Sequence, residues 1–199
     1  MRKARLGVIG VGWWGTVGHL DPLSRDDRAE IVAVQSRSID KAQRRAERYG
    51  VPHFYADYRR MIDECDMDGV IIATTPNVHY EQARYALERG LHVLIEKPFV
   101  LHAQQAEQLG AMARSRGLLL SVCSPNCFHP WVVETRRLVR SGALGRIQLM
   151  THAYSQRVYD LYEGNVPAMF GPLKGVDDVR PDATSYSDPE IAGGGEAHG

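Results

Sequence analysis

The chain has 199 residues, with 24 Lys and Arg against 24 Asp and Glu, so its formal net charge is zero. A neutral balance argues against a nucleic-acid partner, because that affinity comes largely from Lys and Arg on phosphates. Three cysteines are too few for a disulfide framework and favour a cytoplasmic location. No apolar run approaches the roughly 18 residues that a membrane-spanning helix needs, so we expect no membrane partner.

Short apolar runs rich in Val, Ile and Leu recur along the first two thirds of the chain. They do not alternate cleanly, which is typical of strands buried on both faces. The stretches between them have helical spacing and end at glycine, a residue that tolerates the left-handed conformation. Strands are expected at 6–10, 30–34, 69–73, 91–95 and 118–122, and helices at 38–49, 77–89 and 101–116. This alternation predicts an α/β fold with a doubly wound parallel sheet, the Rossmann architecture.

The pattern changes after the last of these strands. Pro130 is expected to begin a helix that runs to about Ser141, and the alternating stretch 145–157 predicts a strand of an antiparallel sheet. Residues 158–199 have little periodicity, and one strand cannot make a sheet. The sequence therefore predicts a Rossmann domain over 1–123, followed over 124–199 by the start of an incomplete α+β domain for substrate binding and oligomerisation.

A glycine motif follows the first predicted strand directly. Gly10, Gly12 and Gly15 match the dinucleotide fingerprint, in which the glycines serve a tight turn, approach to the pyrophosphate and helix packing. The helix that follows would turn free N–H groups toward the phosphates. Trp13 and Trp14 are bulky for such a loop, and we expect at least one of them to pack in the core or to border the cofactor.

The end of the second strand indicates which nicotinamide cofactor is bound. The fingerprint asks for an acid about 20 residues on, to bind the ribose hydroxyls of NAD. Here Ser36 and Arg37 occupy that place, and Lys41 follows on the next helix. A serine can hydrogen-bond a 2′-phosphate and an arginine can pair with it, so NADP is preferred over NAD. The alternative is that Arg37 is a surface residue stacking on adenine.

Two further stretches, ATTPNVHYEQARYALERGLHVLIEKPF (73–99) and SGALGRI (141–147), carry a family resemblance. Together with the glycine motif they resemble the Gfo/Idh/MocA family of NAD(P)-dependent oxidoreductases. The resemblance implies a Rossmann domain joined to a second domain with a large, mostly antiparallel sheet. It also implies a homo-oligomer, a dimer or tetramer, for the full-length protein.

The resemblance implies roles for residues at the ends of two strands. The loop that lies along the nicotinamide half of the cofactor corresponds to Thr74, Thr75, Pro76, Asn77 and His79. Glu96, Lys97 and Pro98 match the family's Glu-Lys-Pro, whose lysine faces substrate and nicotinamide, so Lys97 is the candidate catalytic residue. Adjacent residues on an extended chain point opposite ways, so Glu96 and Lys97 are not expected to pair simply with each other. For His79, capping or supporting the loop is an equal alternative to contact with the cofactor, and Lys97 has the alternative of an ordinary exposed lysine.

Two departures from the family pattern matter. Cys127 stands where the family often has an arginine, and the Cys123, Cys127 and His129 spacing is a poor match to zinc sites, so we expect buried or cofactor-lining thiols and no metal. The final stretch IAGGGEAHG (191–199) corresponds to the beginning of the family's substrate-side motif. Its aspartate and histidine are missing, and His198 is one residue out of register, so the chain is expected to stop inside its active site.

These features predict an NAD(P)-dependent oxidoreductase that transfers hydride between nicotinamide and a sugar, cyclitol or related polyol. The alternative from a different class is a non-catalytic NADP-binding sensor or regulatory module of the same fold, because fold alone does not settle function.

Overall fold

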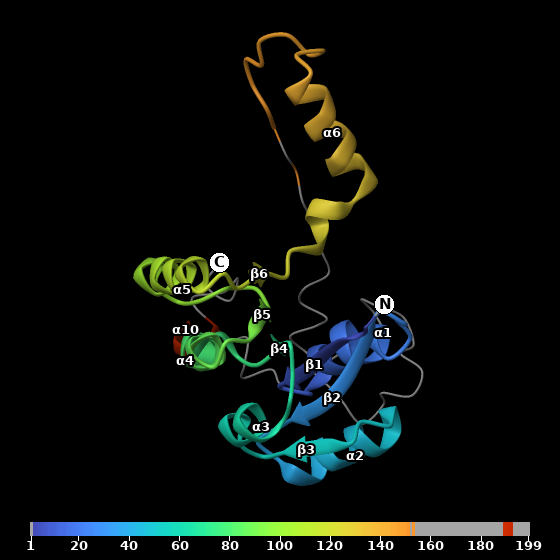
Figure 1. The fold of residues 1–199 in the computed structure, drawn as a ribbon. Helices are drawn as coiled ribbons and strands as arrows, with labels where there is room; N and C mark the ends of the chain where they lie inside the picture. The colour runs from blue at the N-terminus through green and yellow to red at the C-terminus, as the bar shows by residue number, and fades with distance from the viewer. Residues whose placement is uncertain (1, 152, 154–188, 193–199) are drawn as a thin grey trace.

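The computed structural model describes residues 2–151, 153 and 189–192, and a six-stranded parallel sheet forms its centre (Figure 1). The strand order is β3-β2-β1-β4-β5-β6, so the direction of winding reverses between β1 and β4. This is the doubly wound Rossmann order, in which ligands bind beyond the carboxyl ends of the strands at that reversal. The strands are β1 (Ala4–Ile9), β2 (Ala29–Gln35), β3 (His53–Tyr55), β4 (Gly69–Ile72), β5 (His92–Ile95) and β6 (Leu120–Val122).

Helices cover both faces of the sheet. On one face α3, α4 and α5 pack on a core that includes Ile9 and Ile72, and on the other η1 and α2 pack on a core that includes Val8 and Ile71. Neighbouring residues of one strand thus enter opposite cores, which explains why the apolar runs do not alternate. The helices are η1 (Gly15–Leu20), α1 (Asp21–Leu23), α2 (Ile39–Tyr49), α3 (Tyr58–Glu64), α4 (Pro76–Glu88), α5 (Ala103–Ser115), η2 (Pro125–Phe128), α6 (Pro130–Arg140) and α10 (Pro189–Ala192).

The predicted elements of the sheet are confirmed, with their ends moved by one or two residues. The glycine ends are confirmed too: Gly50 ends α2 in the left-handed region at φ +65°, which glycine adopts without steric cost. The prediction missed β3 and α3. β3 is a short edge strand with exposed His53 and Phe54, so it carries little apolar pattern. α3 is seven residues long and buries only Met61 and Ile62.

The segment after β6 differs in part from expectation. The predicted helix is confirmed as α6, which stands away from the sheet in Figure 1. The strand predicted for 145–157 is wrong over its described part, because residues 145–151 and 153 form no strand. A strand needs a partner, and within the described ranges none pairs with this stretch; Leu149 and Met150 are 81% and 80% exposed. The rest of that predicted strand lies outside the described residues.

None of the helices in the described part of the chain is long and apolar enough to cross a bilayer.

Candidate active site

The glycine motif forms a tight loop at the carboxyl end of β1. Gly10 has φ +90°, and a Cβ there would lie 2.8 Å from the Ala73 carbonyl oxygen and 2.7 Å from Thr74 Cγ2. A Cβ on Gly15 would overlap the Gly10 carbonyl oxygen, so the helix can approach the strand only with glycine here. Around Gly12, by contrast, no atom of the described residues would lie within 4 Å of a Cβ. Two glycines are therefore required by packing, and the third leaves open space that a ligand can enter.

The helix after this loop starts with the two tryptophans. Trp13 is buried, with 6% of its surface exposed, so it packs in the core, one of the two places that the sequence allowed. Trp14 is half-buried, and its indole Nε1 donates a hydrogen bond of 2.7 Å to Glu96 Oε1. The chain then forms a π-helical turn, η1, in which backbone hydrogen bonds join residues five apart in the chain instead of four.

The residues predicted at the adenosine end follow β2. The Ser36 backbone N–H donates to the Tyr55 carbonyl at 3.1 Å, which fixes the chain as it leaves the sheet. The side chain of Arg37 is exposed, and within the described residues neither Arg37 nor Lys41 forms an ion pair. Ser38 caps α2 by accepting from the Lys41 backbone N–H at 3.4 Å. These two cations near Ser36 are thus free to meet an anionic ligand.

The loop after β4 is ordered by short polar contacts. Thr74 Oγ1 donates to Gln82 Oε1 at 2.6 Å, and Thr75 is the extended residue before α4. Pro76 is the first residue of that helix, and Asn77 in its first turn is exposed. Among the described residues, no side chain caps the N-terminus of α4. The loop therefore presents the N-terminus of α4 at the same edge of the sheet as the glycine loop.

His79 ties this loop to the next one. Its side chain is fully buried, its Nε2 lies 3.0 Å from the Thr74 carbonyl oxygen, and its Nδ1 lies 3.1 Å from the carbonyl oxygens of Pro98 and Phe99. Burial lowers the pKa of His79, although the backbone carbonyls oppose that shift. Both ring nitrogens lie within hydrogen-bonding distance of backbone carbonyl oxygens. This is the geometry expected if His79 supports the loop.

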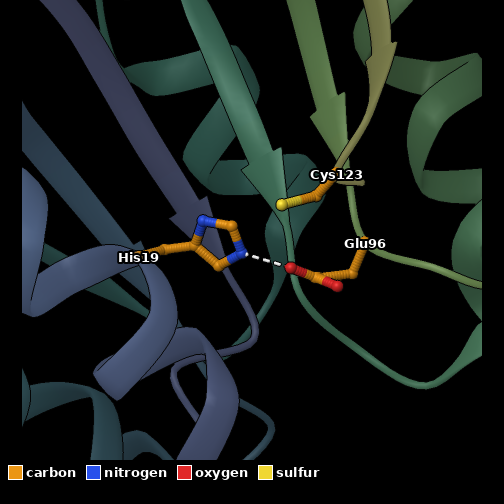
Figure 2. A group of neighbouring side chains, drawn as sticks. All are labelled: His19, Glu96 and Cys123. Atoms are coloured by element: carbon orange, nitrogen blue, oxygen red, sulfur yellow. Dashed lines mark hydrogen bonds and ion pairs between the residues drawn. The ribbon is translucent and has the colours of Figure 1, made fainter. Parts of the chain in front are cut away.

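Glu96 and Lys97 follow β5; the Glu96 side chain is buried and the Lys97 side chain is exposed, and they form no ion pair with each other, in line with the expectation that these neighbours do not pair. Glu96 is 4% exposed, and His19 Nε2 lies 2.7 Å from its Oε1 (Figure 2). Its Oε2 accepts a bond of 3.1 Å from the Lys97 backbone N–H. Burial alone would raise the pKa of the Glu96 carboxyl, but hydrogen bonds from His19 and Trp14, with the Cys123 thiol nearby, lower it to about 2. Lys97 and Pro98, joined by a cis peptide bond, are exposed.

The architecture and this site agree with a comparison to protein families. Residues 4–124 match the Gfo/Idh/MocA model, described as an oxidoreductase family with an NAD-binding Rossmann fold. The chain belongs to this family.

Individual Gfo/Idh/MocA relatives are longer than this chain. A dTDP-3,4-didehydro-2,6-dideoxy-alpha-D-glucose 3-reductase from Actinomadura kijaniata is 32% identical over 151 residues, covering 76% of this chain and 45% of that protein. The scyllo-inositol 2-dehydrogenase (NADP(+)) IolU of Bacillus subtilis is 29% identical over 169 residues, covering 84% and 51%. The crystal structure of KijD10, a 3-ketoreductase from A. kijaniata in complex with NADP and TDP-benzene, superposes with a TM-score of 0.67 at 33% identity, over 74% of this chain and 45% of that one. The chain thus spans about half the length of the curated relatives it matches.

The structure of this Gfo/Idh/MocA chain also brings in His19, which the sequence did not single out, and places it with Glu96 and Cys123. Figure 2 shows His19, Glu96 and Cys123 converging from η1, the end of β5 and the end of β6, with ligand atoms within 4.8 Å of one another. Burial raises the pKa of the Cys123 thiol to about 11, and the Glu96 charge adds to the shift. No local motif marks His19, and the sequence grouped Cys123 with Cys127 and His129 instead, because the meeting of His19, Glu96 and Cys123 depends on how the strands are ordered.

The cysteine cluster considered from the sequence does not assemble. Cys123 is half-buried, but Cys127 and His129 are exposed, so Cys127 is not the buried thiol that was one of the two expectations. Cys127 lies on η2, beyond the sheet, where its Sγ meets only Ser124 Oγ at 3.7 Å among the described residues. His198, the candidate near the end of the chain, lies outside the described residues.

Proposed function

We propose that this chain is the cofactor-binding part of an oxidoreductase that takes NADP in preference to NAD and acts on a CH–OH group of a sugar, cyclitol or related polyol. The observation that carries the proposal is a convergence at one edge of the sheet. The glycine loop, the Thr74–Asn77 loop and the Glu96–Lys97 segment follow β1, β4 and β5, which are neighbours in the sheet. Relatives named for reduction of a nucleotide-linked sugar and oxidation of scyllo-inositol support the substrate class.

The residues present fit a dinucleotide. Gly10 and Gly15 are required by close backbone packing, whereas Gly12 opens onto space that a pyrophosphate would use. Trp14 lies beside this loop, and Thr75, Pro76 and Asn77 would line the nicotinamide half. His79 would act from behind by holding the Thr74 and Pro98 backbones rather than by touching the cofactor.

The preference for NADP rests on the end of β2. No carboxylate stands at 35–38 to repel a 2′-phosphate, while Arg37 and Lys41 carry positive charge beside the Ser36 hydroxyl. An arginine that is not already paired gains the full benefit of a charge-assisted bond to phosphate. Fluorescence titration of the chain with NADPH and NADH tests the preference, and tighter binding of NADH would overturn it.

Lys97 is the proposed catalytic residue. Lys97 is exposed at the carboxyl edge of the sheet, just after β5. As an ammonium it can donate a hydrogen bond and a proton to a reacting carbonyl oxygen, and as the neutral amine it can take the proton of a reacting hydroxyl. The nicotinamide, when bound, supplies the hydride acceptor or donor. Glu96 holds the backbone of Lys97 from the buried side.

The deciding experiment is a turnover assay of the 199-residue chain, and of any longer natural form, with NADP and a panel of sugars and cyclitols. Hydride transfer to or from a panel member supports the oxidoreductase proposal. Tight NADPH binding with no transfer in either form would favour the sensor or regulatory alternative.

A homo-oligomer, dimer or tetramer, is part of the proposal for the full-length protein. Large apolar side chains after β6 are exposed, among them Trp131, Val133, Val139, Leu149 and Met150. Light scattering on the full-length protein tests the assembly.

We also place the protein in the cytoplasm, which three free cysteines support. A division into domains near residue 123 is proposed too, because the parallel sheet of the described residues ends at Val122.

A further inference from the structure

The buried carboxylate of Glu96 is held by donors from two directions. Trp14 Nε1 and His19 Nε2 each lie 2.7 Å from Oε1, and the Lys97 backbone N–H lies 3.1 Å from Oε2. The side chains of His19 and Glu96 are 7% and 6% exposed, so water does not replace a lost donor easily. A buried carboxylate that loses one donor is costly, because the charge then remains without compensation.

We propose that His19 and Trp14 are positioning residues that fix the Glu96 carboxylate and, through it, the backbone from which Lys97 projects. This proposal rests on the proposed role of Lys97. Neither residue needs to touch substrate: they act through Glu96, whose second oxygen is bound to the Lys97 N–H.

The π-helical turn explains why these two donors reach one oxygen. Trp14 and His19 are five residues apart, and on an α-helix of 3.6 residues per turn they would point about 140° away from each other. The wider turn of η1 spans that spacing with one backbone bond and brings the two side chains toward the same side. The π-helical turn thus places two N–H donors, Trp14 Nε1 and His19 Nε2, within hydrogen-bonding distance of Glu96 Oε1.

The contact also crosses the sheet. The helix carrying Trp14 and His19 follows β1, and Glu96 follows β5, with β4 between those strands. The hydrogen bonds therefore join the glycine-loop side of the site to the Lys97 side. Precise placement of a catalytic group matters because a shift of about 1 Å can cost about a hundredfold in rate.

A zinc ion is the competing explanation for the convergence of His19, Glu96 and Cys123, because zinc accepts all three donor types. The contacts favour the hydrogen-bonded arrangement. Oε1 already accepts from two N–H groups, and Oε2 accepts from a third. Zinc would have to displace at least one of these donors and deprotonate a thiol whose pKa is raised to about 11.

The test compares His19→Leu, which removes the donor, with His19→Gln, which keeps an N–H at similar reach. Amide hydrogen exchange of the 199-residue chain is followed by NMR, and kcat is measured with the substrate found in the panel. We expect His19→Leu to speed exchange of the Lys97 amide about tenfold and to lower kcat at least tenfold, while His19→Gln stays within about threefold of wild type. Trp14→Phe, which removes only the N–H, is the second variant should His19→Leu not fold.

The Glu96 amide is the internal control, because it donates to the Ile72 carbonyl at 2.9 Å and not to the carboxylate. Leu109→Ala, a fully buried position of α5 outside the His19–Glu96–Lys97 contacts, is the matched destabilised variant and should leave kcat unchanged. Equal acceleration of the Lys97 and Glu96 amides, or an unchanged Lys97 amide in both donor-free variants, would overturn the proposal. So would stoichiometric zinc binding to wild type that is lost in His19→Leu. Absence of turnover in wild type would sink the proposed function alone, because the exchange measurement still tests the positioning.

Discussion

Glu96 and Lys97 are neighbours in the chain, yet the carboxylate is buried and accepts a 3.1 Å hydrogen bond from the backbone N–H of the lysine, whose side chain is exposed. The two neighbours therefore differ in surroundings: the acid binds the backbone from the buried side, and the lysine side chain is exposed after the end of β5. A salt bridge between the two side chains would instead have paired the ammonium that the proposed function assigns to the substrate.

Replacing Lys97 by alanine is expected to cut turnover at least a hundredfold and to change NADPH affinity by no more than about threefold, because the ammonium acts on substrate and not on the phosphates. Steady-state kinetics and a fluorescence titration measure the two quantities. Lys3→Ala, an exposed lysine before β1, is the control and should behave as wild type. Near-normal turnover in Lys97→Ala would remove this residue from the mechanism.

Replacing Arg37 by alanine is expected to weaken NADPH binding about tenfold and leave NADH binding within about twofold, because a charge-assisted bond to the 2′-phosphate is lost. The control is Arg44→Ala, an exposed arginine further along α2. If NADPH and NADH weaken equally, Arg37 stacks on adenine, as the alternative from the sequence holds.

Much of this fold could be predicted because the local signals and the tertiary structure agree. Val8 and Ile9 enter opposite cores, so an unbroken apolar run was a reliable sign of a central strand. β3 was not predicted, because an edge strand of three residues with exposed His53 and Phe54 has almost no apolar pattern in the sequence. The strand expected at 145–157 was a misleading signal, since alternation alone does not supply a pairing partner.

In the candidate site, too, some residues could be placed from the sequence and others could not. Gly10, Gly15 and Lys97 could be placed because their roles depend on the ends of strands, which the sequence marks. His19 could not, since its contact with Glu96 needs the order β1-β4-β5 and a π-helical turn that no residue type announces. The burial of His79 was equally open, because a histidine after Asn77 is compatible with either a cofactor contact or a contact to the neighbouring backbone.

The two glycines with different surroundings predict different outcomes for the same substitution. Gly15→Ala is expected to cost about 1 to 3 kcal/mol of stability, because its Cβ would overlap the Gly10 carbonyl oxygen, a backbone atom. The Cβ of Gly12→Ala meets no atom within 4 Å in the part of the chain that the structure describes. This substitution should leave the unfolding free energy unchanged while weakening NADPH binding at least tenfold. Denaturant unfolding and cofactor titration separate the two effects. Equal NADPH affinity in Gly12→Ala and wild type would show that the pyrophosphate does not lie against this residue.

The lowered pKa of Glu96 makes stability depend on pH in a predictable direction. Folding lowers the pKa of this carboxyl from its ordinary value of 4.5 to about 2, so the ionised form is favoured in the folded state. The contribution is fully present above the unfolded pKa and is lost as the pH falls through the folded one. At about 1.4 kcal/mol per pH unit, the contribution to the free energy of unfolding is about 3 kcal/mol at most.

Glu96→Gln, which cannot ionise and brings an N–H toward other donors, should therefore be less stable than wild type at neutral pH. The difference should shrink as the pH is lowered from about 5 toward about 2, measured by denaturant unfolding of both proteins at each pH. Asp63→Asn, at an exposed ion pair with Arg89, is the control and should show a much smaller change over that range. A wild-type to Glu96→Gln difference that stays constant with pH would mean that the hydrogen bonds from His19 and Trp14 do not stabilise the ionised carboxylate.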